Sequence, residues 1–84
     1  MTDIEVLKKL QQAYPEAQFS ISGEGCRFTV QAIGAIFSGL STLERQRLLN
    51  KVLEEPLKSG AIHAVQYRIY TPEQWVQQHE HQRG

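Results

Sequence analysis

One cysteine and three histidines are among the side chains of this chain that could act as a nucleophile, a base or a metal ligand. Cys26 closes a glycine-rich turn, His63 stands near the start of a run of strand-forming residues, and His79 and His81 belong to a polar C-terminal segment. A catalytic cysteine needs a base and a third group that orients the base. His63 could be the base, but the sequence names no third group. We therefore expect a binding protein and no enzyme.

Metal chemistry would have to use the same few residues. The chain lacks the C-x-x-C and H-E-x-x-H metal patterns and the phosphate-binding loop. A [2Fe–2S] cluster takes four ligands, usually thiolates, with histidines in some sites, so Cys26 and His63 would supply at most half of the set. Residue chemistry alone leaves a second interpretation open, in which Cys26 is an ordinary turn residue and His63 a structural histidine.

Arg45, Arg47 and Lys51 form a small basic group on an expected helix. One interpretation is a docking patch for a phosphate or an acidic partner, because Arg and Lys bind such groups. The other is a solvated helix face balanced by Glu44 and Glu54. Nine basic and nine acidic residues leave the chain with no net charge. That balance argues against a protein whose main task is to hold nucleic acid or an anionic membrane.

The elements that must position these residues begin with a helix. A capping-box pattern places its start near Asp3, and Pro15 should end it. Two alternating runs, 17–22 and 27–32, flank the turn Gly23–Gly25 and predict an antiparallel hairpin. The apolar stripe of the first helix is expected to consist of Ile4, Leu7, Leu10 and Tyr14.

The second half of the chain predicts a helix, a strand and a last helix. The stretch 41–60 opens with another capping box and favours a long helix, with a break or kink at Pro56. Residues 62–70 are rich in β-branched and aromatic types and alternate, which predicts a half-buried strand. Thr71 should then cap a helix over 72–81.

The order α-β-β-α-β-α predicts an α+β fold in which helices cover one face of a three-stranded mixed sheet. We expect one domain over residues 1–84. A single cysteine excludes an internal disulfide, and neither a signal-peptide pattern nor an apolar run of membrane-spanning length occurs, so we expect a cytoplasmic protein. The expected core consists of Leu7, Leu10, Phe19, Phe28, Val30, Leu49, Val52, Leu53, Val65 and Ile69.

Two stretches together resemble the BolA family: FSGLSTLERQRLLNKVL, from Phe37 to Leu53, and IHAVQYRIYTPEQW, from Ile62 to Trp75. Members of that family have a phenylalanine-glycine turn, a helix with an R-x-R/H-type segment, I-H-A before a strand, and often T-P-x-x-W. The segment 22–28 is most similar to the short acid-stress branch. The resemblance covers nearly the whole chain and implies an α-β-β-α-β-α fold related to the class II KH arrangement.

The resemblance also implies a function. BolA-like proteins pair with monothiol glutaredoxins of the CGFS type, and the two together bind a [2Fe–2S] cluster used in iron–sulfur trafficking and iron sensing. The ligands implied for this chain are His63, from I-H-A, and Cys26 in the hairpin loop, with a glutaredoxin cysteine and glutathione supplying the rest. In the acid-stress branch the loop ligand is often a histidine one position later, where this chain has Arg27.

A second function class also follows from the resemblance, because some members are described as DNA-binding transcriptional regulators of the stress response. The G-x-x-G loop with which KH domains clamp a nucleic-acid backbone is absent between the helices. The support for DNA binding is therefore the group of Arg45, Arg47 and Lys51. A plain adaptor that never touches iron, and a homodimer of the chain when alone, stay open alternatives.

Overall fold

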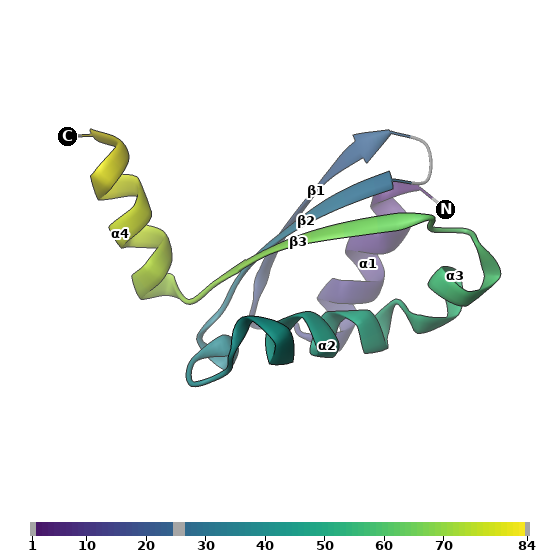
Figure 1. The fold of residues 1–84 in the computed structure, drawn as a ribbon, viewed down its shortest axis with the longest axis horizontal. Coiled ribbons are helices and arrows are strands. Elements are labelled where there is room, and N and C mark those ends of the chain that lie inside the picture. Colours follow the sequence, from purple (N-terminus) through teal and green to yellow (C-terminus); the bar gives the residue numbers. More distant parts are fainter. Residues whose placement is uncertain (1, 25–26, 84) are drawn as a thin grey trace.

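The computed structural model describes residues 2–24 and 27–83. Three strands form one sheet: β1 (Gln18–Glu24) pairs antiparallel with β2 (Arg27–Ile33), and β2 pairs parallel with β3 (Ala64–Tyr70). The strand order is β1-β2-β3, so β2 is central and both outer strands are edges (Figure 1). The predicted three-stranded mixed sheet is confirmed, with its last strand starting two residues later than expected.

Two helices, α1 (Asp3–Ala13) and α2 (Thr42–Val52), pack against one face of the sheet. They meet it in a single buried cluster, which holds the alternate residues of β2 that face the helices. The cluster consists of Val6, Leu10, Ala17, Phe28, Val30, Ala32, Phe37, Leu49, Leu53 and Ile62.

Three shorter or more peripheral elements complete the chain. A 3-10 turn, η1 (Ala35–Phe37), follows β2, and α3 (Glu54–Ser59) follows α2. The last helix, α4 (Pro72–Arg83), continues from β3 and projects beyond the end of the sheet (Figure 1). Within residues 2–24 and 27–83, no helix is long and apolar enough to cross a membrane.

All three predicted helix caps form by reciprocal hydrogen bonds. The Thr2 hydroxyl accepts from the backbone N–H of Glu5, whose carboxylate accepts from the backbone N–H of Thr2. Ser41 and its partner three residues on repeat this pattern at the start of α2. At α4 the Gln74 side chain accepts from the N–H of Thr71, and the Thr71 hydroxyl accepts from the N–H of Gln74. Each box satisfies N–H groups that the first turn of a helix leaves without partners.

The break predicted at Pro56 occurs one turn earlier, at Leu53, which ends α2 and starts α3. A proline ring clashes with the carbonyl four residues before it, so the chain must leave the helical path ahead of the proline. Pro56 itself is the third residue of α3, where its missing N–H costs no intrahelical bond. Gly60 ends α3 with φ 85°, a left-handed conformation that glycine adopts without strain.

The predicted core is largely confirmed, but the inward face of α1 was predicted wrongly. Leu10, Phe28, Val30, Leu49 and Leu53 are buried, and Phe19, Val52, Val65 and Ile69 pack half-buried against them.

On α1, however, Val6 is fully buried, Ile4 is 61% exposed, and Leu7 lies outside the core cluster. The inward stripe is Val6, Leu10 and Tyr14, spaced four residues apart, and this stripe shares only Leu10 and Tyr14 with the predicted one.

Candidate metal and partner-binding site

His63 is exposed and lies directly before β3. The residue before it, Ile62, is buried, and its N–H donates to the carbonyl of Pro56 at 3.0 Å. The residue after it, Ala64, opens the strand and pairs with β2. The backbone of His63 is thus fixed on both sides while its imidazole reaches solvent, which is the arrangement that a ligand offered to a partner requires.

The start of β3 and the β1–β2 hairpin lie at the same end of the sheet (Figure 1). The parallel register pairs Arg27 with Ala64, the two residues that immediately follow Cys26 and His63 in the chain. Cys26 itself lies outside the described residues. The β1–β2 register closes the hairpin by pairing Glu24 with Arg27.

The described residues hold no group of three or more His, Cys, Asp or Glu side chains that could bind a metal ion. Among the described residues at this end of the sheet, His63 is the one histidine. Any metal centre built on it therefore needs further ligands from outside the described residues or from another molecule.

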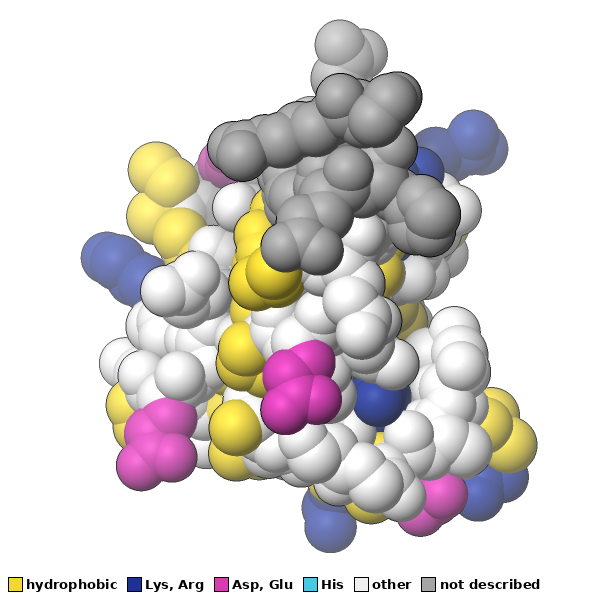
Figure 2. All heavy atoms as spheres, turned by 90° about the vertical axis from the view of Figure 1, so that its left-hand side faces the viewer, with side chains coloured by type: hydrophobic (Ala, Val, Ile, Leu, Met, Phe, Trp, Pro, Cys, Tyr) yellow, Lys and Arg dark blue, Asp and Glu magenta, His cyan; other side chains and the backbone are white. Residues whose placement is uncertain are grey.

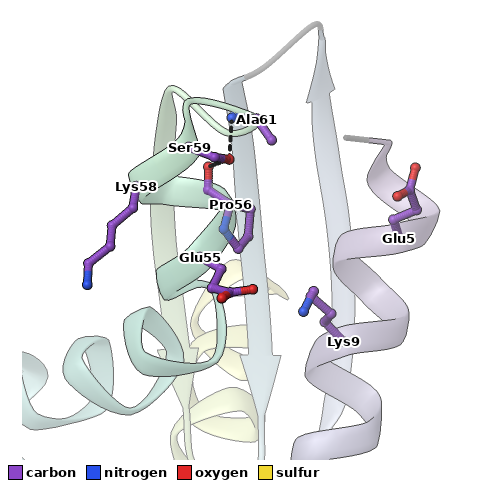
Figure 3. A pocket seen from close by; sticks show the side chains of 7 residues that line it. All are labelled: Glu5, Lys9, Glu55, Pro56, Lys58, Ser59 and Ala61. Atoms are coloured by element: carbon purple, nitrogen blue, oxygen red, sulfur yellow. Dashed lines mark hydrogen bonds between the residues drawn. The ribbon is translucent and has the colours of Figure 1, made fainter.

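A cleft of about 740 Å³ opens between α1 and α3, under the segment that leads to His63. Lys9 on α1 and Glu55 on α3 point toward each other across the cleft, while Lys58 points away from it (Figure 3). The Ser59 hydroxyl accepts from the N–H of Ala61 at 3.3 Å and shapes the upper rim. The walls carry both signs of charge, through Glu5, Lys9 and Glu55.

Arg45 is committed to contacts inside the molecule. Its Nε donates to the carbonyl of Leu40 at 3.1 Å, and its Nη1 donates to the carbonyl of Ile69 at 3.1 Å and to Oε1 of Gln74 at 2.9 Å. The guanidinium therefore joins the start of α2 to the end of β3 and the first turn of α4. The prediction had placed this residue in a docking patch.

Arg47 and Lys51 are exposed and lie four residues apart, so they share one face of α2. Arg45 lies on another side of the helix, so the structure does not gather the three predicted cations into one group. Hydrogen bonds from Ser41, and secondarily the charge of Arg47, lower the pKa of the Glu44 carboxyl. A docking role for Arg47 and Lys51 stays a prediction.

One further polar contact was not predicted from the sequence. The Tyr67 hydroxyl donates to Oδ1 of Asn50 at 2.6 Å and couples β3 to α2. Burial raises the pKa of Tyr67 to about 12. Tyr67 alternates in step with the predicted core residues Val65 and Ile69, but nothing local marks Asn50 as its partner, because the two residues are 17 positions apart.

Comparison with known proteins identifies relatives over most of the chain. The acid stress protein IbaG of Escherichia coli K12 is 33% identical over 76 residues, which cover 90% of each chain. A BolA protein homologue from Coxiella burnetii has a similar structure, with a TM-score of 0.78 and 26% identity over 89% of this chain and 96% of that one. The solution structure of yeast Fra2 matches with a TM-score of 0.72 and 29% identity, over 89% and 84% of the two chains.

The family model for BolA-like proteins matches residues 3–74, from the first residue of α1 to the capping glutamine of α4. It includes the three strands of the sheet and the segment that holds His63. These matches confirm the resemblance and the fold class inferred from the sequence. The chain belongs to the BolA-like family.

Proposed function

We propose that this chain is a binding module that shares a [2Fe–2S] cluster with a monothiol, CGFS-type glutaredoxin and glutathione, in iron–sulfur trafficking or in iron or stress sensing. The observation that carries the proposal is the pairing of Arg27 with Ala64, because these residues directly follow the two candidate ligands, Cys26 and His63. Membership of the BolA-like family supports the same assignment.

The ligand count among the described residues supports a cluster that is shared with another molecule. Four ligands are needed, and the described residues contain no group of three or more. The chain would offer His63 and Cys26, and the partner would bring the other two. A cluster bound there would supply iron and sulfide that can be passed to a client or whose presence can be sensed.

The chain's own contribution is to present the imidazole and to receive the partner. An imidazole binds a metal in its neutral form, and exposure lets a partner approach His63 without unfolding the strand. The cleft beside it offers Lys9 and Glu55 on opposite walls (Figure 3), so a docked partner can place a carboxylate and a cation against them.

DNA binding has weaker support. Arg45 is occupied by intramolecular hydrogen bonds, which leaves Arg47 and Lys51 as the exposed members of the predicted basic group. Two phosphate contacts give a slope of about −2 in a plot of log affinity against log salt. A tight complex that discriminates DNA sequence at physiological salt would favour the regulator over the cluster module.

The test is to reconstitute the chain with a monothiol glutaredoxin, glutathione, iron and sulfide, and to record the visible absorption and circular dichroism spectra. His63→Ala should change the spectrum and shorten the lifetime of the mixed cluster, and Cys26→Ser should do the same. The double variant His79→Ala/His81→Ala is the matched control, because it removes imidazoles outside the proposed ligand set.

Each outcome assigns the ligands differently. An unchanged spectrum and lifetime for His63→Ala would show that the ligand assignment is wrong. If Cys26→Ser alone leaves the spectrum and lifetime of the mixed cluster unchanged, the second ligand lies elsewhere in the chain. If the control variant alone loses the cluster, the C-terminal histidines are the ligands.

A further inference from the structure

The end of the sheet opposite His63 carries an apolar groove that the proposed function does not use. Two adjoining cavities, of about 410 and 200 Å³, share Glu16 and Ile36 in their linings. We call them together the end groove, lined chiefly by Tyr14, Glu16, Ile33, Ile36, Trp75 and Val76.

Two of the most exposed apolar side chains of the described residues line the end groove. Val76 on α4 is 53% exposed and Ile36 in η1 is 37% exposed. A view onto this end of the molecule shows a stripe of hydrophobic side chains flanked by acidic ones (Figure 2). Clustered exposed apolar side chains with a polar rim are typical of a protein-binding surface.

The charge carried by the described lining residues of the end groove is negative. Glu16 is the one ionisable carboxylate among its lining residues, and no Lys or Arg lines either cavity in the described part of the chain. Glu73 lies in the first turn of α4, next to the lining residue Pro72. The carbonyl end of α1 also points here, and its last turn holds no basic residue to offset the negative end of the helix dipole.

We propose that the end groove binds a short amphipathic segment of a partner protein that combines apolar side chains with Lys or Arg. The apolar side chains would fill the space between Ile36 and Val76, and the cation would lie against Glu16 and the end of α1. Tyr14 and Trp75 add aromatic surface of the kind that anchors such segments.

This partner is different from the one that shares the cluster. The parallel strands β2 and β3 begin at the His63 end and finish at the end groove, and seven residues of strand span roughly 20 Å. Both partners can therefore be bound at once, which would make the chain an adaptor. The groove proposal does not rest on the cluster, so His63→Ala should leave binding at the end groove unchanged.

The test begins with selection of a random peptide library displayed on phage against the whole chain. Selected peptides, made synthetically with a fluorescent label, are then measured by anisotropy at low and high salt. We expect sequences with apolar residues next to Lys or Arg, and Val76→Gln should weaken their binding at least tenfold. Leu43→Gln on α2 is the matched control, because Leu43 is equally exposed (54%) but lines neither cavity.

A charge test completes the design. Glu16→Lys should weaken binding several-fold at low salt and less at high salt, while Glu55→Lys, in the other cleft, should not. The proposal is overturned if selected peptides bind Val76→Gln and Ile36→Gln as well as the parent, or if they are enriched in Asp and Glu. It is also overturned if sedimentation shows a dimer that Val76→Gln dissociates, because the occupant would then be a second copy of the chain.

Discussion

Replacing Arg45 with alanine should destabilise the fold more than any other change to a charged residue of α2. The substitution removes three hydrogen bonds, of which those to Leu40 and Ile69 are part-buried and the one to Gln74 is exposed. We assign about 1 kcal/mol to each part-buried bond and about half of that to the exposed one. The free energy of unfolding should therefore fall by about 2.5 kcal/mol, and Tm by roughly 10–20 °C.

The assay is urea unfolding followed by far-ultraviolet circular dichroism at 25 °C. Arg47→Ala is the matched control, because Arg47 lies on the same helix, is exposed and donates no hydrogen bond within the described residues. It should change stability by less than about 0.5 kcal/mol. Equal effects of the two substitutions would refute the structural role of Arg45. Arg45→Lys should recover only part of the loss, since an ammonium cannot reproduce the planar fork of donors.

Four further substitutions test other parts of the fold. Leu53→Ala removes a fully buried side chain and should cost about 2–4 kcal/mol, whereas Val65→Ala, half-buried, should cost less than half of that in the same urea assay. Gly23→Ala should destabilise the hairpin by about 1–3 kcal/mol or more, because Gly23 has φ 137° and an added Cβ would collide with the opposing strand; unchanged hairpin amide signals in NMR spectra would contradict this. Tyr67→Phe deletes the bond to Asn50 and should cost about 0.5–1.5 kcal/mol in thermal unfolding. Burial raises the pKa of Tyr67 in the folded state to about 12. The contribution of the neutral phenol to the free energy of unfolding is therefore complete below about pH 10 and is lost as the pH rises toward 12, and ultraviolet titration of the phenol checks this.

Local chemistry made the starts of α1, α2 and α4 predictable. Thr2, Ser41 and Thr71 each find their cap partner three residues away, so the pattern in the sequence and the bonds in the structure involve the same atoms. The inward face of α1 was not fixed in this way. Ile4, Leu7 and Leu10 fit a helical stripe as well as Val6 and Leu10 do, and only contact with the sheet selects Val6.

The candidate site was predictable where a motif fixed it and not where it depended on distant contacts. The run of strand-forming residues predicted that His63 lies near the start of a strand, and the residue lies directly before β3. The role of Arg45 was not visible in the sequence, because two of its acceptors lie 24 and 29 residues away. The end groove could not be predicted from the sequence for the same reason, since α1, η1 and α4 each contribute only part of its lining.

The parallel pairing of β2 with β3 has a consequence for the order in which the chain matures. The β1–β2 hairpin is local and can form within about 1–10 μs. The pairing of Arg27 in β2 with Ala64 in β3 is not local, because η1, α2 and α3 lie between the two strands in the chain, so it forms later. During synthesis, the ribosome releases β3 after every other strand. A nascent or partly unfolded chain therefore cannot present the finished sheet end that holds His63. If the proposed cluster binds at His63, its loading would then be restricted to molecules whose sheet is complete.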